Sequence, residues 1–448
     1  MNFTQVKSIK RIVYMKHRSK LFITLMLLGI CSFSYGQTTQ LSLKDALTYA
    51  LKNHPDIKNK VLGEAYADAQ VLETKSIGIP QVSANIQFVN NTQKQVFVFP
   101  INGVPTPIRV GNNFVTTGTL QANWLALDAS YFLGLRAAKG FTDLAKLQTG
   151  LSSRDVSINV TKAYYLVLIT KENIDLLKQN ITTLETALKQ TEGYYKNGFA
   201  EKLDVDRLSL TLSNLNVQFD ALKDQATITE QLLKFNMGMP IETSIELTEN
   251  LETLYKSNVD DILKTFDAKL RIEYQLLQTQ LTLSNLDKKR YEVSKYPNLV
   301  LFANYQQNNF GDNIDFGTWY GNSFWGFKVG IPIFSGGNNK AQITKSKISI
   351  DQINNTISLF ESGTALEANQ AKSKLNRSLK TIDIQKKNLE LANEILRVSS
   401  AKLKEGVGSN LEITNAQQEV KTSQTNYLNA IYDLLNAQIE LKKAYGKL

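Results

Sequence analysis

The chain has 448 residues, of which 42% are hydrophobic and 21% charged, and its formal net charge is +10. This length can bury a large core and allows two or three domains. The single cysteine, Cys31, lies near the start of the chain, and His54 is the one histidine beyond the first 36 residues. The rest of the chain therefore lacks the residues for disulfides, Cys/His zinc sites and histidine-based catalytic triads.

Residues 1–36 are predicted to be a secretory signal peptide. A basic start without acidic residues precedes the apolar run Leu21–Phe33, and cleavage is expected after Gly36. Cleavage removes six Lys or Arg and no acid, so the net charge falls from +10 to about +4, and nucleic-acid binding loses its main support. Two alternatives stay open: a start at Met15, and lipidation of Cys31, although the residues before it make a poor lipobox.

Two helices are predicted next, separated by Pro55. Ser42 followed three residues later by Asp45 resembles a capping box at the start of the first helix. Apolar residues between Leu43 and Leu51 share one face of that helix. The second helical run extends from Asp56 to about Ser76.

Alternating apolar and polar residues predict two strand pairs, at about 81–127 and about 298–334. The first pair is interrupted by a proline-containing segment that we expect to be a long loop. Strands of about ten residues with one apolar and one polar face suit a membrane-spanning β-barrel. A half-exposed soluble hairpin is the alternative. The apolar positions are Val82, Ala84, Ile86, Phe88, Leu120, Ala122, Trp124, Trp325, Phe327 and Val329.

Aromatic residues are concentrated around the last strand. Trp325 and Phe327 alternate with glycine and lysine, which is the pattern of a lipid-facing wall with a wet interior. Tryptophan and tyrosine are enriched where a membrane meets water. Trp319, Tyr320 and Trp325 are therefore our candidates for membrane-interface residues.

Long helical segments follow each strand pair and turn back at a glycine. Segments at about 128–236 and about 338–446 carry apolar residues at alternating steps of three and four, which predicts antiparallel coiled hairpins turning at Gly198 and Gly406. A structural coiled coil with no other role is the alternative. A further apolar set on the last helix is expected to pack against neighbouring chains: Leu428, Ile431, Leu435 and Ile439.

The second hairpin repeats the first at an offset of 208 residues. Residues 37–238 and 263–448 are therefore predicted to be two structural repeats, joined by a mixed segment at 239–262. The predicted fold class is mainly α with transmembrane β. Matching pairs are Gly198 with Gly406, Leu203 with Leu411, Asp204 with Glu412, Phe219 with Tyr427, and Gly238 with Gly446.

The predicted sheet cannot stand alone in lipid. Two strand pairs supply only four strands, and the polar groups on the edges of an open sheet would be unsatisfied in a bilayer. Several chains must share one barrel if these strands lie in a membrane.

This order of elements, occurring twice, resembles TolC-type outer-membrane efflux channels over essentially the whole mature chain. The resemblance implies a homotrimer with a 12-stranded barrel in the lipid of the outer membrane and a helical tunnel in the periplasm. It also implies that the helical tips dock a periplasmic adaptor protein linked to an inner-membrane pump. The residues that carry it are LSLKDALTYALKNHP, the strand entries at Pro80 and Pro297, PIFSGG, and the tip segments YYKNGFAEKLDVDRL and LKEGVGSNLEITNA.

The resemblance also assigns candidate site residues. Such channels often carry acidic residues just after the second tip, where three protomers form a cation-binding constriction that opens as coiled helices untwist. Glu412 occupies the first such position, Asn415 replaces the second acid, and Asp204 takes the corresponding place in the first hairpin. An acid in the first turn of a helix also offsets the helix dipole, so that alternative stays open. Gly198 and Gly406 mark the tips that would dock the adaptor.

The predicted function is passive conduction, as the channel of a tripartite efflux or type I secretion system. The sequence has no GxxxxGK[ST] nucleotide loop, so a partner must supply the energy. We expect no cofactor and no enzymatic activity. A non-conducting coiled-coil scaffold or surface adhesin is the alternative, and it would stay soluble without detergent. A periplasmic carboxylate hydrolase is disfavoured because no acid pair stands in a recognisable pocket motif.

Overall fold

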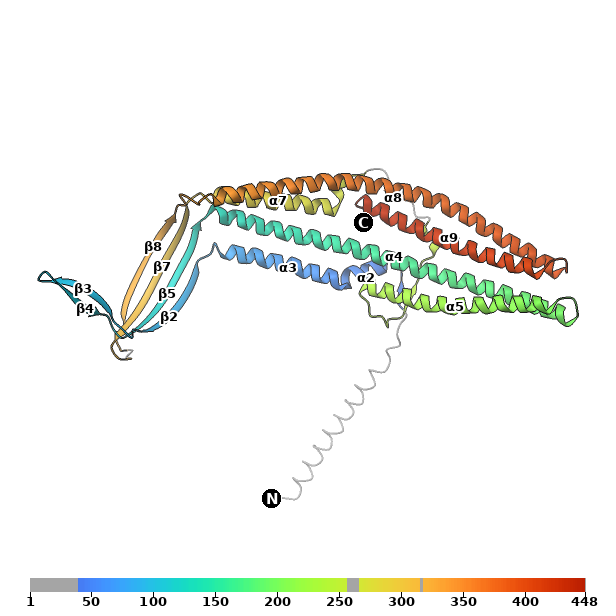
Figure 1. The fold of residues 1–448 in the computed structure, drawn as a ribbon, viewed down its shortest axis with the longest axis horizontal. Coiled ribbons are helices and arrows are strands. Elements are labelled where there is room, and N and C mark those ends of the chain that lie inside the picture. The colour runs from blue at the N-terminus through green and yellow to red at the C-terminus, as the bar shows by residue number, and fades with distance from the viewer. Residues whose placement is uncertain (1–38, 256–265, 315–316, 448) are drawn as a thin grey trace, which may run out of the picture. The chain divides into compact units, whose positions relative to one another are not determined.

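The computed structural model describes residues 39–255, 266–314 and 317–447 (Figure 1). The predicted signal peptide, with Cys31 and Met15, lies outside the described residues. Two compact units divide the chain. The tip unit comprises Met1–His54, Val156–Ser257 and Leu379–Asn436, and the sheet unit comprises Pro55–Asp155, Asn258–Ser378 and Ala437–Leu448.

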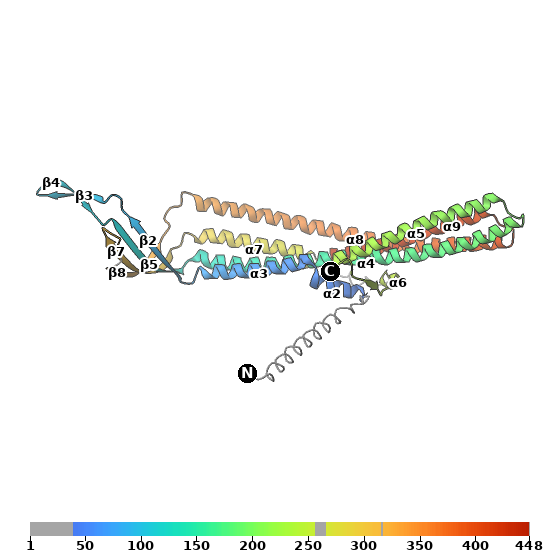
Figure 2. The same cartoon turned by 90° about the horizontal axis from the view of Figure 1, so that it is seen from below.

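Two helical hairpins form most of the tip unit (Figure 2). Helix α4 (Ala129–Lys196, 68 residues) turns back into α5 (Lys202–Met237), and α8 (Asn338–Lys404, 67 residues) turns back into α9 (Asn410–Ala444). Helices α4, α8 and α9 contribute residues to both units. The two hairpins supply the long helical segments that the apolar spacing predicted.

The apolar seams predicted for these helices are buried or half-buried, apart from the exposed Tyr195. Between α4 and α5 the buried side chains pack as in a coiled coil. Burying one aliphatic side chain completely stabilises the fold by about 1.5–3 kcal/mol. The cluster consists of Leu177, Ile181, Leu184, Leu208 and Leu215.

The second apolar set on α9 is not available to neighbouring chains, so that prediction was wrong. Leu428, Ile431, Leu435 and Ile439 are all at most 5% exposed within a single chain. The tip unit explains much of this burial, because α9 contacts α4 as well as its hairpin partner α8 there; Gln424 of α9, for example, is hydrogen-bonded to α4. A helix packed on two sides needs two apolar faces.

A small element completes the tip unit. Strand β1 (Thr39–Leu41) pairs in parallel with β6 (Ile245–Leu247), and α2 (Leu43–Asn53) and α6 (Leu251–Tyr255) lie next to them in the chain. The predicted capping box of α2 is confirmed, since the Asp45 N–H donates to the Ser42 hydroxyl at 3.1 Å. The buried Tyr164 hydroxyl on α4 donates to the Leu41 carbonyl at 3.0 Å and so ties the element to the hairpins.

The sheet unit contains a four-stranded antiparallel sheet in the order β2, β5, β7, β8 (Figure 1). Its strands are β2 (Gln81–Asn90), β5 (Phe114–Leu127), β7 (Asn298–Gly311) and β8 (Tyr320–Gly330). The unit also holds α3 (Pro55–Ser76), the 3₁₀ turn η1 (Ala268–Leu270) and α7 (Ile272–Val293). Among the described residues, no helix combines the length and apolar character needed to cross a membrane.

The register of the sheet gathers the predicted apolar positions on one face. Ala122 pairs with both Val82 and Ala303, and Ala303 pairs with Trp325. The other face carries mainly glutamine, asparagine, serine and threonine. The apolar face is exposed, with Trp325 at 85% and Phe327 at 67%.

The segment expected to be a long loop is a β-hairpin, so that prediction was wrong. Strands β3 (Gln95–Ile101) and β4 (Val104–Val110) pair over seven residues each. Asn102 and Gly103 form the turn with φ of 52° and 83°, the left-handed values that favour an Asn-Gly hairpin turn. A two-stranded ribbon has two free edges, where the missing N–H of a proline is tolerated.

Candidate gate at the helical tips

Both hairpin tips turn with the same backbone geometry. The N–H groups of Gly198 and Phe199, and those of Gly406 and Val407, donate to carbonyls three and five residues earlier at 2.8–3.0 Å. Gly198 and Gly406 have φ of 80° and 75°. These hydrogen bonds define a helix end that requires a left-handed residue, usually glycine. The sequence identified both glycines as turn residues, and the structure gives them that role.

Exposed apolar side chains follow each tip glycine. Phe199 is 84% exposed and Val407 is 79% exposed. Leu203 and Leu411, each in or beside the first turn of the returning helix, are also exposed. These two pairs are related by the 208-residue offset, which was the signal that could have identified them from the sequence.

The predicted gate residues lie close to the tips but belong to two hairpins. Glu412 and Asn415 are exposed and three residues apart, which places them on one face of α9. The Glu412 N–H donates a hydrogen bond to the Ser409 hydroxyl at 3.2 Å, which caps the start of α9. Asp204 is half-buried in the first turn of α5. The structure therefore places Glu412 and Asn415 together and Asp204 in the other hairpin.

Buried polar side chains join α4 to α9, which sequence reasoning missed. The Asn180 amide donates to Gln424 at 2.7 Å, and the Thr191 hydroxyl donates to Asn410 at 3.0 Å. Both bonds are buried, where an unpaired polar group costs about 1–3 kcal/mol. They join residues 219 to 244 positions apart, so no local pattern could pair them.

Three of the buried polar residues on α9 lie seven positions apart. Gln417 lies midway between Asn410 and Gln424 and is buried, and its Nε2 atom has no hydrogen-bond partner within the described residues. Residues spaced by seven share one face of a coiled helix. We call Asn410, Gln417 and Gln424 the polar ladder.

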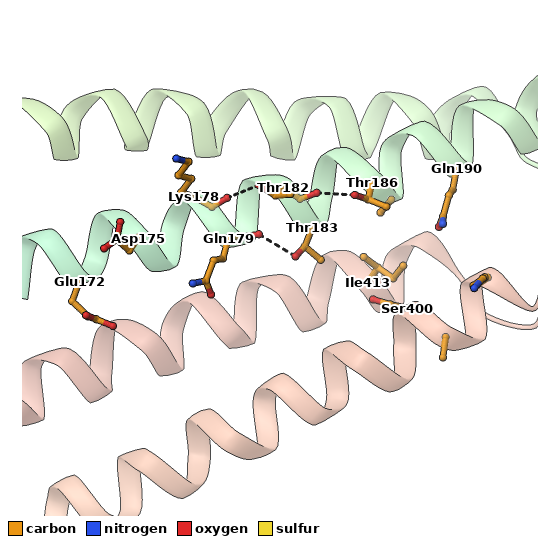
Figure 3. A pocket seen from close by; sticks show the side chains of 13 residues that line it. Glu172, Asp175, Lys178, Gln179, Thr182, Thr183, Thr186, Gln190, Ser400 and Ile413 are labelled. Carbon is orange, nitrogen blue, oxygen red and sulfur yellow. Dashed lines mark hydrogen bonds between the residues drawn. The ribbon is translucent and has the colours of Figure 1, made fainter. Parts of the chain in front are cut away.

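An open groove of about 990 Å³ lies in the tip unit (Figure 3). Its walls come mainly from α4 and the end of α8, with Ile413 contributed by α9. The Thr182, Thr183 and Thr186 hydroxyls donate to carbonyls of their own helix at 2.9–3.0 Å. Polar residues predominate among those that line the groove, and three of their hydroxyls are already hydrogen-bonded.

A cluster of two arginines with largely buried side chains and two partly exposed glutamates lies at the start of α7 in the sheet unit. Glu273 accepts from Arg154 at 2.6 Å and from Arg271 at 3.0 Å, and Arg271 also contacts Glu367 at 2.8 Å. Burial alone would raise the pKa of the Glu273 carboxyl, but the hydrogen bonds from both arginines lower that pKa to about 2. This cluster links α4, α7 and α8 and had no signal in the sequence.

The three candidate interface aromatics lie at two positions along the length of the sheet. Trp319 and Tyr320 lie where β8 begins, and the Tyr320 ring lies 6.0 Å from that of Phe310. Trp325 lies halfway along β8, five residues further on. Tyr320 points to the polar face and Trp325 to the apolar face, because odd and even positions alternate.

The remaining chemistry of the described residues is sparse. No group of three or more His, Cys, Asp or Glu side chains among them is arranged to hold a metal ion.

Comparison with known proteins identifies a family. Residues 291–447 match the sequence model described as "Outer membrane efflux protein". Over these residues the chain is similar to the outer membrane efflux protein family. The predicted resemblance to TolC-type channels is thereby confirmed. The family consists of outer-membrane channels, which also confirms the predicted location and the prediction that the protein is not an enzyme.

Individual relatives extend the similarity along the chain. The outer membrane protein TolC of Vibrio cholerae is 20% identical, with 97% of this chain and 96% of TolC covered. The proteases secretion protein PrtF of Dickeya chrysanthemi is 20% identical, with 94% of this chain and 92% of PrtF covered. The relatives are therefore matched along nearly their full lengths.

Solved structures show the same fold. The outer membrane protein VceC of Vibrio cholerae superposes with a TM-score of 0.73 at 15% identity, covering 90% of this chain and 96% of VceC. The open-state MtrE outer membrane channel of Neisseria gonorrhoeae has a TM-score of 0.71 at 15% identity, covering 93% of each chain.

Proposed function

We propose that this protein is the outer-membrane channel of a tripartite efflux or type I secretion system, and that three copies form one conduit. The observation that carries the proposal is the four-stranded sheet, in which β2 and β8 are the outer strands and one face is apolar and exposed. Edges left open in lipid would cost several kcal/mol for each unsatisfied group. Three copies would close them as a 12-stranded barrel.

The strand directions support this closure. All pairs in the sheet are antiparallel, and with four strands in sequence β2 and β8 also point in opposite directions. Pairing β2 with β8 of the next copy therefore continues the antiparallel pattern. The apolar face then meets lipid and the polar face lines a watery pore.

The gate would open by separating α9 from α4. The polar ladder joins these helices through two buried hydrogen bonds, and its middle residue, Gln417, has an unpaired buried amide nitrogen. When such a contact opens, its polar groups exchange hydrogen bonds within the protein for hydrogen bonds to water, and the free-energy cost is modest. Untwisting of the second hairpin would expose the ladder and widen the tunnel, with Glu412 and Asn415 near its end.

Partners would supply the energy and choose the cargo. The chain has no nucleotide-binding loop, so conduction is passive. Relatives described as a proteases secretion protein and as a solvent efflux pump outer membrane protein indicate that similar chains serve different exporters. An adaptor would dock at the tips that carry Gly198 and Gly406, where the exposed Phe199 and Val407 and the groove along α4 offer contact surface.

The deciding experiment isolates the protein from outer membranes in detergent. Native mass spectrometry should find a trimer, and planar bilayers containing it should show ion conductance. A stable monomer in detergent-free buffer would overturn the proposal and favour the scaffold or adhesin. Glu412→Ala should change conductance or leakiness without abolishing the channel.

A further inference from the structure

The β3–β4 hairpin exposes apolar side chains on both of its faces, and Arg109, which pairs with Val96, is the one charged residue in its two strands. Phe97, Phe99 and Ile101 lie on one face, and Val96 and Val98 lie on the other, and all five are at least 42% exposed. A solvated ribbon normally keeps one polar face, and an isolated two-stranded hairpin is marginally stable in water. Both faces of this hairpin therefore need a covering surface.

Lipid is a poor covering for this ribbon. Each strand has an outer edge that pairs with no other strand among the described residues, and open sheet edges do not occur in the hydrocarbon of a bilayer. Pro100, Pro105 and Pro107 remove three N–H groups but leave all the carbonyl groups. A covering surface must tolerate polar edges while burying apolar faces.

The hairpin is anchored where the sheet ends. Asp312, just after β7, accepts from the Lys94 ammonium at 2.8 Å and from the Asn113 N–H at 3.1 Å. The Asn91 N–H donates to the Asn113 carbonyl at 2.7 Å across the base. Figure 1 shows the hairpin leaving the sheet at the end farther from α3 and α7. The base is thereby fixed at the rim of the sheet.

An apolar band lies at the same end of the mainly polar face, which also carries Val300, Phe302 and Phe324 further along the strands. Val89 pairs with Val115, Val115 pairs with Phe310, and the Phe310 ring lies 6.0 Å from that of Tyr320. Their neighbours two positions along each strand are polar: Gln87, Thr117, Asn308 and Asn322. The mouth of the pore would therefore be lined by apolar side chains, with polar side chains next to them further inside the pore.

The hairpin is long enough to reach the centre of that mouth. Seven residues in each strand, at about 3.4 Å per residue, give a length of about 24 Å. Twelve strands about 4.8 Å apart and tilted by about 40° enclose a radius of about 12 Å. Hairpins from three copies would consequently meet at the axis.

We propose that the β3–β4 hairpins of three copies pack against one another across the outer mouth of the barrel, with the Phe97 face of each on the Val98 face of the next. This inference rests on the proposed trimeric channel. Contacts around a three-fold axis join unlike surfaces, which explains why both faces expose apolar side chains. The packed hairpins form an outer constriction, separate from the gate at the helical tips.

Cysteine crosslinking tests the contact between unlike faces. Cys31 lies in the predicted signal peptide, so introduced cysteines are expected to be the only ones in the mature protein. Val96→Cys and Phe99→Cys lie on opposite faces of one strand, and their separation prevents a disulfide within one hairpin. Oxidised membranes carrying both substitutions should yield covalent trimers, whereas either single variant should not.

The outcomes separate this inference from the proposed function. A native trimer that conducts but gives no covalent trimer in the double variant overturns the hairpin contact alone. Disulfides to another envelope protein overturn it as well, and the absence of any native trimer overturns both proposals. Replacing residues 95–110 by a short Gly-Ser linker should raise conductance about twofold or more, because apolar constrictions restrict ions by dewetting. Unchanged conductance would show that the hairpins do not constrict the mouth.

Discussion

Helix α9 and strand β8 are both amphipathic, yet most apolar side chains of α9 are buried and those of β8 are exposed. Leu434 on α9 is 1% exposed, whereas Trp325 on β8 is 85% exposed. The helix finds its partners within one chain, so its core is complete in a monomer. The sheet presents an apolar face that one chain cannot cover, so its environment must come from lipid and from other copies.

Removing a buried side chain from α9 should produce the largest loss of stability. Leu434→Ala is expected to lower the free energy of unfolding by about 2–5 kcal/mol, because it removes packed methyl groups and leaves a cavity. Denaturant unfolding in detergent, followed by far-UV circular dichroism, measures the loss. Val407→Ala, at the exposed tip, is the control and should stay within about 0.5 kcal/mol of the parent. Equal effects would show that the helical core is not complete in one chain.

The ion cluster of the sheet unit should make stability depend on acid pH. The carboxyl of Glu273 has a pKa of about 2 in the folded protein, below its ordinary value of 4.5. Its contribution is at most about 3 kcal/mol, because solvent partly screens this half-buried group; it is fully present above pH 4.5 and disappears as the pH falls toward 2. Glu273→Gln should remove most of this dependence.

Unfolding curves collected between neutral and acid pH provide the measurement. Glu394→Gln is the matched control, because its partner Arg397 lies on the surface and the pair is solvated. That variant should keep the pH dependence of the parent. A parent whose stability does not change below pH 4.5 would contradict the role of the cluster.

Adjacent residues on β7 test which face of the sheet meets lipid. Ala303→Arg places a charge on the apolar face and should cost about 2–4 kcal/mol for folding into bilayers, while Asn304→Arg on the polar face should cost about 0–1 kcal/mol. Both residues pair with β8 in the same antiparallel register. Folding into lipid vesicles measures both costs. Similar costs would rule out a lipid-facing wall.

Much of the fold was readable because it depends on local periodicity. Helical spacing identified the seams around Leu184 and Leu434, and alternation identified β2 and β8. The capping box at Ser42 was readable because its partners are three residues apart. Each of these signals lies within a few turns or one strand.

The errors came from contacts with distant or absent partners. Leu428 and Leu435 were assigned to neighbouring chains because the sequence does not show that α9 packs on two sides. The Asn102-Gly103 turn was a readable signal that the nearby prolines obscured. The Asn180 and Gln424 pair joins residues 244 positions apart, so only the folded hairpins reveal it.

The smallest predicted effect concerns the polar ladder, where we expect α9 to separate from α4 when the channel opens. Thr191→Val keeps the side-chain shape but removes the hydroxyl that donates to Asn410 at 3.0 Å in a buried contact. A loss of about 1 kcal/mol from the closed state should raise the open probability about fivefold in single-channel recordings. Thr186→Val is the control, because the exposed Thr186 hydroxyl donates to its own helix at 2.9 Å. If both variants raise the open probability equally, the hydrogen bond between α4 and α9 does not hold the channel closed. The helices would then stay packed up to their tips without it.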